Sequence, residues 1–414
     1  MSAFTYRDHQ LSCDTVGLSA LAEAAGTPCY VYSAAAIAAR YRAIDAAFGA
    51  YPHALHYALK ANSTLAIARL LRELGSAADA NSGGEIEVAR RAGFTPDAIV
   101  FTGVGKTREE LELAVALGVK TINAESAGEL ERIDQVARGL GTQARVALRV
   151  NPDIDALSHP HISTGLGRNK FGVPLGDAPA ILRDAAGYAG IRVVALHLHV
   201  GSQMMSLEPV RRAAGAAAAL ARELHASGVP IEYLDLGGGL GISYDGRPAP
   251  TFEDYAAAIL DGVQSSGLPL VIEPGRAIVG PAGALVARVV DVKPQPGDKH
   301  FVVLDAGMTE LLRPALYGAF HRIVPVREGT VGEVAVDIVG PLCESSDTLG
   351  ADRRLPLPRV GDLLAVLDAG AYGSAMAFNY NRRLLPPETL VENGAWRLIR
   401  RRQTIDDMLA LECS

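Results

Sequence analysis

An alternation of apolar strands and amphipathic helices, repeated eight times from residue 55 onward, is the strongest constraint that this sequence places on its own fold. The expected strands are residues 55–60, 77–80, 98–102, 120–123, 145–150, 193–200, 231–236 and 268–273. Helical patterns such as residues 64–74, 84–92, 108–117 and 127–138 lie between them. Open doubly wound sheets usually stop at about five or six strands. Eight consecutive units therefore predict a closed (β/α)8 barrel.

Polar side chains stand where these strands end. The residues are Lys60, Asp79, Arg149, Asn151, His197, His199, Gly237–Gly239, Glu273 and Arg276. In a (β/α)8 barrel the working groups come from the carboxyl ends of the strands, whichever strand supplies them. This distribution supports closure of the barrel and predicts a site at that end.

The sequence changes in character after Gly280. Alternating β-branched runs appear at residues 285–292, 300–304, 333–339 and 363–367, and only residues 308–320 and 404–411 look helical. A chain of 414 residues is also too long for one ordinary core. We expect residues 1–33 to pair with a mostly β C-terminal domain at 281–414, and residues 34–280 to form the barrel.

Composition narrows the class of protein. The net charge of −7 leaves no basic face for nucleic acid. The four cysteines show no CxxC spacing, so neither a disulfide framework nor a zinc knuckle is indicated. We find no basic, apolar leader and no apolar run long enough to cross a membrane. These features predict a cytoplasmic protein without nucleic-acid or membrane partners.

Lys60 ends the first strand, in Tyr-Ala-Leu-Lys-Ala-Asn. The chain carries 33 arginines and only six lysines, so a lysine at this place suggests a need for the amine itself. An amine can condense with a carbonyl to form a Schiff base, which a guanidinium cannot do. The hexapeptide alone also fits a lysine that merely reaches solvent past an apolar surface.

Each of the other strand-end motifs allows two interpretations. His197 and His199 lie on one face of a strand, which suits either zinc or an imidazole stacked on a flat cofactor ring; zinc would need further ligands. The Gly237–Gly239 run fits a phosphate cradle or a simple tight turn. Glu273 and Arg276 fit a surface ion pair, or a carboxylate facing a ring nitrogen beside a phosphate-binding guanidinium. Gly105-Lys106-Thr107 lacks the first glycine of a P-loop, since Val100 occupies that position.

Taken together, Tyr-Ala-Leu-Lys-Ala-Asn, His-Val-Gly-Ser-Gln, the glycine run and Glu-Pro-Gly-Arg resemble the alanine-racemase-fold (type III) pyridoxal-phosphate decarboxylases. Three later motifs resemble the diaminopimelate decarboxylases within that group. They are Arg-Pro-Ala-Leu-Tyr from Arg313, Gly-Pro-Leu-Cys-Glu-Ser from Gly340, and Asp-Ala-Gly-Ala-Tyr-Gly from Asp368. The similarity runs from about Tyr6 to Leu411. One departure is Arg382-Arg383-Leu384, where the family usually has Ser-Arg-Pro.

The resemblance implies a role for each matching residue, with pyridoxal 5′-phosphate as cofactor and no metal. Lys60 would hold the cofactor covalently, His199 would stack on its ring, and Glu273 would face its pyridine nitrogen. The other cofactor-binding residues implied are Asp79, Ser202, Gly237, Gly238, Gly239, Gly275, Arg276 and Tyr372. The substrate-binding residues implied are Arg276, Arg313, Tyr317, Glu344 and Tyr372. Cys343 would donate a proton near the reacting carbon, and so joins Lys60 and His199 as catalytic.

The resemblance further implies decarboxylation of meso-2,6-diaminopimelate to L-lysine, the last step of bacterial lysine synthesis, by a homodimer with shared sites. Three alternatives stay open. A racemase of this fold would put an arginine where Glu273 stands, and a non-catalytic cofactor carrier would be a barrel alone. An ornithine- or arginine-type decarboxylase is the nearest rival, but its substrates lack the distal carboxylate that Arg313 would bind.

Overall fold

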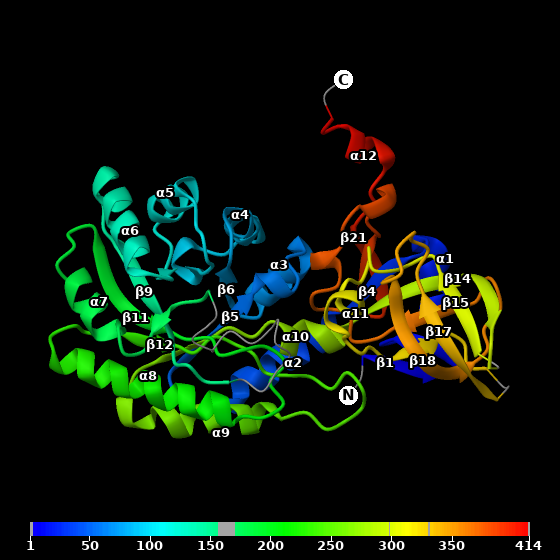
Figure 1. Ribbon diagram of the computed structural model, residues 1–414, viewed down its shortest axis with the longest axis horizontal. Coiled ribbons are helices and arrows are strands. Elements are labelled where there is room, and N and C mark those ends of the chain that lie inside the picture. Colours follow the sequence, from blue (N-terminus) through cyan, green and yellow to red (C-terminus); the bar gives the residue numbers. More distant parts are fainter. Residues whose placement is uncertain (1–2, 156–169, 298, 330–331, 413–414) are drawn as a thin grey trace. The chain divides into compact units, whose positions relative to one another are not determined.

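The computed structural model describes residues 3–155, 170–297, 299–329 and 332–412 (Figure 1). The chain forms two compact units. We call Arg40–Ile242 with Pro248–Ala277 the barrel unit, and Met1–Ala39 with Ser243–Arg247 and Ile278–Ser414 the β unit. Each unit is described by itself.

Eight parallel strands close into a barrel in the barrel unit. In order around the barrel they are β5 (His53–Ala58), β6 (Ala77–Ala80), β7 (Ile99–Phe101), β8 (Thr121–Ala124), β9 (Ala144–Asn151), β11 (Ile191–His197), β12 (Tyr233–Asp235) and β13 (Leu270–Ile272). β13 pairs with β5, and β8 pairs with β9, which completes the ring. A short strand, β10 (Val173–Pro174), is added beside β9. The predicted (β/α)8 barrel is confirmed.

Helices follow most of these strands in the barrel unit (Figure 1). They are α3 (Leu65–Glu73), α4 (Gly83–Ala92), α5 (Arg108–Leu117), α6 (Ala127–Gly139), α7 (Ala178–Ala185), α8 (Glu208–Ala226) and α9 (Phe252–Val263). The sequence determines several starts locally. Ser82 caps α4 by accepting from the Glu85 N–H, and Thr107 with Glu110 forms a capping box on α5.

Two strands end two or three residues earlier than predicted, and both differences affect the site. β5 ends at Ala58, so Lys60 lies in the following 3₁₀ turn η1 (Leu59–Ala61) instead of within the strand. β11 ends at His197, so His199 lies on the loop beyond it. Backbone hydrogen bonds to the neighbouring chain segment are still made at each end: the Ala58 N–H donates to the carbonyl of Pro274, and the Leu198 N–H to that of Asp235. Side chains past such an end no longer have to alternate between faces.

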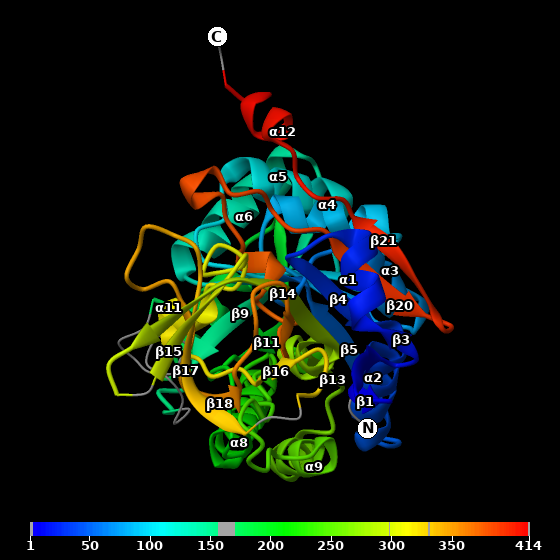
Figure 2. The same ribbon diagram turned by 90° about the vertical axis from the view of Figure 1, so that its right-hand side faces the viewer.

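The β unit contains a large mixed sheet whose strands are ordered β18-β17-β15-β14-β4-β20-β21 (Figure 2). Their bounds are β4 (Cys29–Ser33), β14 (Gly283–Gln295), β15 (Lys299–Leu304), β17 (Glu333–Val339), β18 (Thr348–Pro356), β20 (Glu388–Glu392) and β21 (Ala395–Arg400). β16 (Ile323–Pro325) and β19 (Leu363–Val366) pair with each other, and β19 also pairs with β14. The early strand β4 lies between β14 and β20, antiparallel to the first and parallel to the second.

Smaller elements complete the β unit. β1 (Phe4–Arg7), β2 (Gln10–Cys13) and β3 (Val16–Gly17) form a separate three-stranded sheet, followed by helix α1 (Leu18–Ala25). Buried apolar residues of these elements share a core with β4 and β14. Residues 308–320, predicted to be helical, form only the short helix α11 (Arg313–Tyr317), because Gly318 ends it in a left-handed conformation. The last predicted helix is present as α12 (Ile405–Leu409).

Asp347 determines the conformation of the loop between β17 and β18. Its carboxylate accepts hydrogen bonds from the backbone N–H groups of Met308 (2.6 Å) and Leu342 (2.9 Å). Its own backbone accepts from the Gly340 N–H and donates to the carbonyl of Glu344. Asp347 is only 3% exposed, and a Cβ at Gly340 would overlap its carboxylate. One buried acidic side chain therefore organises the segment that carries Cys343 and Glu344.

Lys106 and Glu129 form a buried ion pair in the barrel unit. The Lys106 Nζ lies 2.9 Å from Glu129 Oε1 and also donates to the carbonyls of Gly103 and Asn123. The two side chains are 2% and 3% exposed. Burial lowers the pKa of Lys106, and the charge of Glu129 opposes that shift. The lysine of the P-loop-like sequence is therefore used inside the protein, to hold the loop after β7.

Breaking this pair should be costly. Lys106→Met should lower the free energy of unfolding by about 3–5 kcal/mol, because Glu129 is left as an uncompensated buried charge. The double variant Lys106→Met/Glu129→Met should recover much of the loss. Arg108→Ala is the matched control: its pair with Glu112 is exposed, and its removal should cost less than about 1 kcal/mol. Chemical denaturation followed by circular dichroism measures all three, and equal losses for both single variants would contradict the assignment.

Removing the Asp347 carboxylate should release its loop. Asp347→Ala leaves the Met308 and Leu342 N–H groups without their acceptor, at about 1–3 kcal/mol each. Hydrogen–deuterium exchange of peptides covering residues 340–346 should accelerate, while barrel peptides keep their rates. Asp352→Ala, which removes an 81% exposed carboxylate from the same pair of strands, is the control. Unchanged exchange at 340–346 would show that the loop does not depend on Asp347.

Candidate active site

The predicted site residues fall into two groups, one in each unit. The barrel unit holds Lys60, Asp79, His199, Ser202, Gly237, Gly238, Gly239, Glu273, Gly275 and Arg276. The β unit holds Arg313, Tyr317, Cys343, Glu344 and Tyr372. Hydrogen bonds join members of the first group to one another, whereas Arg313 of the second group bonds to His321, another residue of the β unit.

Lys60 stands at the rim of the barrel beside a buried carboxylate. Its Nζ lies 3.2 Å from Asp79 Oδ2, and strand pairing of Ala58 with Asp79 places the two side by side. The Lys60 side chain is 34% exposed, whereas that of Asp79 is fully buried. Burial and the nearby Glu273 raise the pKa of Asp79, and the Lys60 ammonium counteracts them. An accessible amine is thus held by a group that itself has no contact with solvent.

His199 is hydrogen-bonded to the glycine run. The Gly238 N–H donates to His199 Nδ1 at 3.2 Å, which leaves that nitrogen as an acceptor. Burial, followed by the Lys60 and Arg149 charges, holds the pKa of His199 well below its ordinary value. The imidazole is therefore neutral, and its plane is fixed by the Gly237–Gly239 backbone. Gly237 and Gly239 have φ values of +64° and +106°, which favour glycine.

Glu273 belongs to a buried cluster with His197 and Asp235. A ligating atom from each of the three lies within 4.8 Å of the other two, and His197 Nε2 is 3.5 Å from Glu273 Oε2. Burial alone would raise the pKa of Glu273, but His197 and Lys60 lower it below its ordinary value. Burial and the charge of Glu273 raise the pKa of Asp235 well above its ordinary value. Of the two adjacent carboxyls, Glu273 is the ionised one.

The two histidines near the end of β11, His197 and His199, have different partners. His197 turns inward to Glu273, whereas His199 lies beyond the strand end against the glycine run. The sequence had placed both on one face. They do not act as a pair, because the strand ends between them.

The segment after β13 contacts both the strand that precedes Lys60 and the loop after β11. The Ala58 N–H donates to the carbonyl of Pro274, and Arg276 Nη2 donates to Ser202 Oγ at 2.9 Å. A Cβ at Gly275 would lie 2.9 Å from the Cβ of Ala61 and 3.1 Å from that of Ala58. Gly275 is therefore needed for close packing against the turn that holds Lys60.

In the β unit, Arg313 is almost completely buried, at 4% exposure, and is held by aromatic neighbours. Its Nη1 lies 2.7 Å from His321 Nε2, and its Cζ lies 4.5 Å from the centre of the Tyr244 ring. Tyr317 is the last residue of the same helix, α11, so the two residues are spaced as predicted on one helix. Neither His321 nor Tyr244 was singled out from sequence, since neither belongs to a recognisable motif.

The other predicted residues of the β unit lie in loops. Cys343 is exposed, and Glu344 follows it in the loop held by Asp347. Tyr372 has a positive φ of 56° and is half-buried. The departure at Arg382-Arg383-Leu384 has structural contacts of its own: Arg383 Nη2 donates to the carbonyl of Asp305, and Arg382 pairs with Glu412.

Membrane insertion by a helix is not indicated. None of the helices in the described ranges combines the length and the apolar character that a bilayer-spanning helix needs.

Comparison with known proteins identifies the family. Residues 34–280 match the family described as "Pyridoxal-dependent decarboxylase, pyridoxal binding domain". The chain is 45% identical over 412 residues to the diaminopimelate decarboxylase of Pseudomonas aeruginosa, covering 100% of this chain and 99% of that protein.

Solved structures agree with this match. One is a diaminopimelate decarboxylase from Helicobacter pylori complexed with L-lysine, with a TM-score of 0.92 and 41% identity, covering 95% of this chain and 99% of that one. Another, from M. jannaschii and also with L-lysine, has a TM-score of 0.94 and 37% identity, covering 100% and 99%. These proteins match the chain from end to end, across both the barrel and the β unit. The chain therefore belongs to the diaminopimelate decarboxylase family of pyridoxal-dependent decarboxylases.

Proposed function

We propose that this protein uses pyridoxal 5′-phosphate to decarboxylate meso-2,6-diaminopimelate, giving L-lysine and carbon dioxide in the last step of bacterial lysine synthesis. Family membership supports the reaction class. The observation that carries the proposal is the buried Glu273 carboxylate, 3.5 Å from His197, in the same barrel unit as the accessible amine of Lys60. As a biosynthetic enzyme it would act in the cytoplasm on a small amino acid. We also propose the domain limits expected from sequence, 1–33, 34–280 and 281–414.

The residues of the barrel unit fit this cofactor. Lys60 offers an amine for its aldehyde, and the neutral His199 imidazole offers a flat face for its ring. Glu273 Oε1 is buried, and apart from the neighbouring Asp235 carboxyl it has no hydrogen-bond partner among the described residues. Such an oxygen, on a carboxylate kept ionised, suits a protonated pyridine nitrogen.

Backbone and side-chain donors suit the phosphate. The Gly237–Gly239 run supplies N–H groups without side chains to obstruct them, and Ser202 with Arg276 supplies a hydroxyl and a guanidinium that already contact each other. Asp79 would orient the Lys60 amine. Gly275 would contribute by its close packing, and Tyr372 by reaching the cofactor or the substrate.

When bound, pyridoxal phosphate supplies a conjugated ring that can take up the electron pair left as carbon dioxide departs. Glu273 holds the proton on the ring nitrogen, which makes that uptake favourable. His199 holds the ring plane. Cys343 then donates a proton to the reacting carbon, as a general acid.

Substrate choice would depend on the β-unit residues. Arg313 and Tyr317 would bind the distal carboxylate, Glu344 the distal ammonium, and Arg276 and Tyr372 the groups near the reacting carbon. A buried guanidinium forms its strongest contacts with carboxylates, so Arg313 favours a dicarboxylate over ornithine or arginine.

Lys60 should carry the cofactor. Borohydride reduction of the purified, yellow protein should fix pyridoxyl mass on the peptide containing Lys60, because borohydride reduces the imine that joins a lysine amine to the cofactor's aldehyde. In parallel, carbon dioxide release should be measured from meso-diaminopimelate, ornithine, arginine and lysine. Mass on a peptide with any of the other five lysines would refute the role of Lys60. Faster release from ornithine or arginine would refute the substrate.

We further propose a homodimer in which Cys343 and Glu344 complete the site of the neighbouring subunit. Both side chains are exposed on a loop that Asp347 holds in one conformation, which supports such a contribution. A glutamate that binds the distal ammonium would also approach from the side away from Lys60, which would hold the cofactor.

Subunit mixing tests this shared site. Lys60→Ala and Glu344→Ala proteins should each be inactive, but a hybrid dimer should carry one site with both changes and one with neither. Partial activity should therefore return after subunit exchange, with native mass spectrometry to confirm the hybrid. The Lys60→Ala protein mixed with itself is the control. Background activity from verified hybrids would place Glu344 in the site of its own chain.

A further inference from the structure

We infer that His321 and Tyr244 are positioning residues that fix the plane of the Arg313 guanidinium and so determine the preference for a substrate with a distal carboxylate. The inference deepens the proposed function and rests on it for the identity of the substrate. The arrangement of the three side chains is independent of that identity. All three belong to the β unit.

The hydrogen bonds of His321 require one protonation state. An arginine guanidinium is only a donor, so His321 Nε2, at 2.7 Å from Arg313 Nη1, must be an acceptor and carry no proton. His321 Nδ1 lies 2.9 Å from the carbonyl oxygen of Leu367, which only accepts, so Nδ1 must carry the proton. His321 is therefore the neutral Nδ1–H tautomer, and its exposure is zero.

His321 is itself anchored by its neighbours in the chain. Leu367 donates its N–H to the carbonyl of Arg322 at 2.8 Å, which continues the pairing of β16 with β19. The Arg322 guanidinium binds both carboxylate oxygens of Asp368 at about 3.0 Å or less. His321 and Arg322, which are adjacent in the chain, thus bind Leu367 and Asp368, which are also adjacent. The buried His321 ring cannot rotate without breaking its hydrogen bonds to Arg313 and Leu367.

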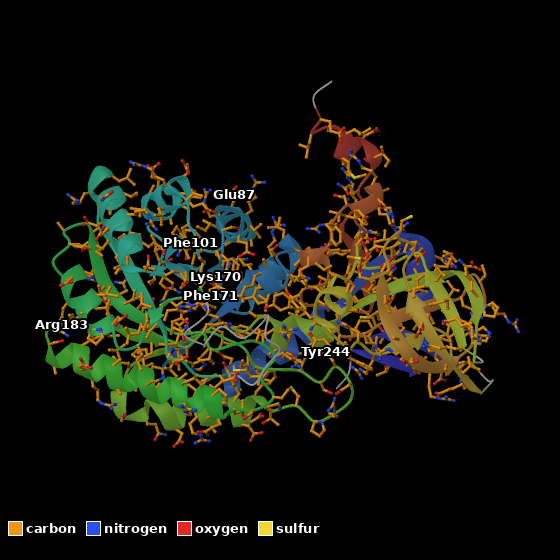
Figure 3. All side chains as sticks on the ribbon, in the orientation of Figure 1. Glu87, Phe101, Lys170, Phe171, Arg183 and Tyr244 are labelled. Carbon is orange, nitrogen blue, oxygen red and sulfur yellow. The ribbon has the colours of Figure 1, made fainter. Side chains whose placement is uncertain are left out.

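Tyr244, which is labelled in Figure 3, packs against the face of the Arg313 guanidinium. The Arg313 Cζ lies 4.5 Å from the centre of its ring, a cation–π distance, and the ring meets His321 edge-on with the centroids 5.0 Å apart. Tyr244 is 8% exposed. One neighbour therefore fixes a guanidinium nitrogen and the other supports its face.

Orientation matters because carboxylate recognition by arginine is planar. A guanidinium binds a carboxylate through parallel N–H groups, and a rotated plane loses that geometry although the charge remains. A neutral His321 also adds no second positive charge beside Arg313. The segment that holds His321 runs directly into Asp368–Gly373, which contains Tyr372. His321 therefore connects two of the proposed substrate-binding groups.

Kinetics should reveal this role as a change in binding. His321→Leu, which removes both hydrogen bonds at similar volume, should raise KM for meso-diaminopimelate by about tenfold or more while kcat changes by less than about threefold. His321→Gln keeps an acceptor and a donor on one flat amide, and should restore most of the loss. Tyr244→Phe should behave as the parent, because the ring remains, and Tyr244→Leu should resemble His321→Leu. A loss confined to kcat, or no rescue by His321→Gln, would overturn the inference.

A double-mutant cycle separates positioning from general damage. Arg313→Ala should raise KM by itself, and adding His321→Leu to Arg313→Ala should change KM no further, because the group that His321 positions is gone. If His321→Leu instead raises KM by the same factor with and without Arg313→Ala, then His321 acts through the stability of the fold. Thermal unfolding of every variant accompanies the cycle.

A spectroscopic measurement tests the arrangement without turnover. In long-range ¹H–¹⁵N spectra of histidine-labelled protein, the signal lost in His321→Leu should show a protonated Nδ1 and an unprotonated Nε2. The Nε2 shift should move in Arg313→Ala. A charged ring or the opposite tautomer would overturn the inference, whatever substrate the parent enzyme takes. Failure of the parent to release carbon dioxide from diaminopimelate would instead refute the proposed function.

Discussion

Pairing of the last barrel strand with the first is the interaction on which the candidate site depends. β13 and β5 are separated by most of the barrel sequence, yet Ile272 lies opposite Leu55 and Leu270 opposite His53. The contact continues past the strands, where the Ala58 N–H donates to Pro274 and Gly275 packs against Ala61. Without closure, Lys60 and Glu273 would belong to opposite edges of an open sheet. With it, the amine and the carboxylate stand at neighbouring strand ends.

Closure also concentrates charge that must be compensated. Asp79, Asp235 and Glu273 are all buried in the barrel unit, at 0%, 0% and 3% exposure. Carboxyls that approach each other without water cannot all ionise, so protons and nearby cations distribute the charge among them. Lys60 offsets Asp79, His197 favours the ionised form of Glu273, and Asp235 is left with a raised pKa. The ionised state of Glu273, which the proposed chemistry needs, is a property of the whole cluster.

The β unit uses a different physical device. Its site residues are exposed or sit on short elements, and buried polar side chains hold them in place. Asp347 fixes the loop with Cys343 and Glu344 through backbone N–H groups, and His321 fixes Arg313 through a required tautomer. In both cases a satisfied buried hydrogen bond gives a site residue or its loop one orientation, because leaving its partner unsatisfied would cost free energy.

The barrel, the mostly β domain after Gly280 and strand-end residues such as Lys60 and Glu273 could all be predicted from sequence alone. They follow from hydrophobic periodicity and local motifs, which are short-range properties of the chain. The prediction from sequence misjudged strand ends by one to three residues, which moved Lys60 and His199 out of their strands. Only the tertiary structure decided that His197 serves Glu273 and that Tyr244 and His321 hold Arg313. Those contacts join residues from different elements, and the pKa shifts depend on burial and on charges brought close by folding, which no local pattern records.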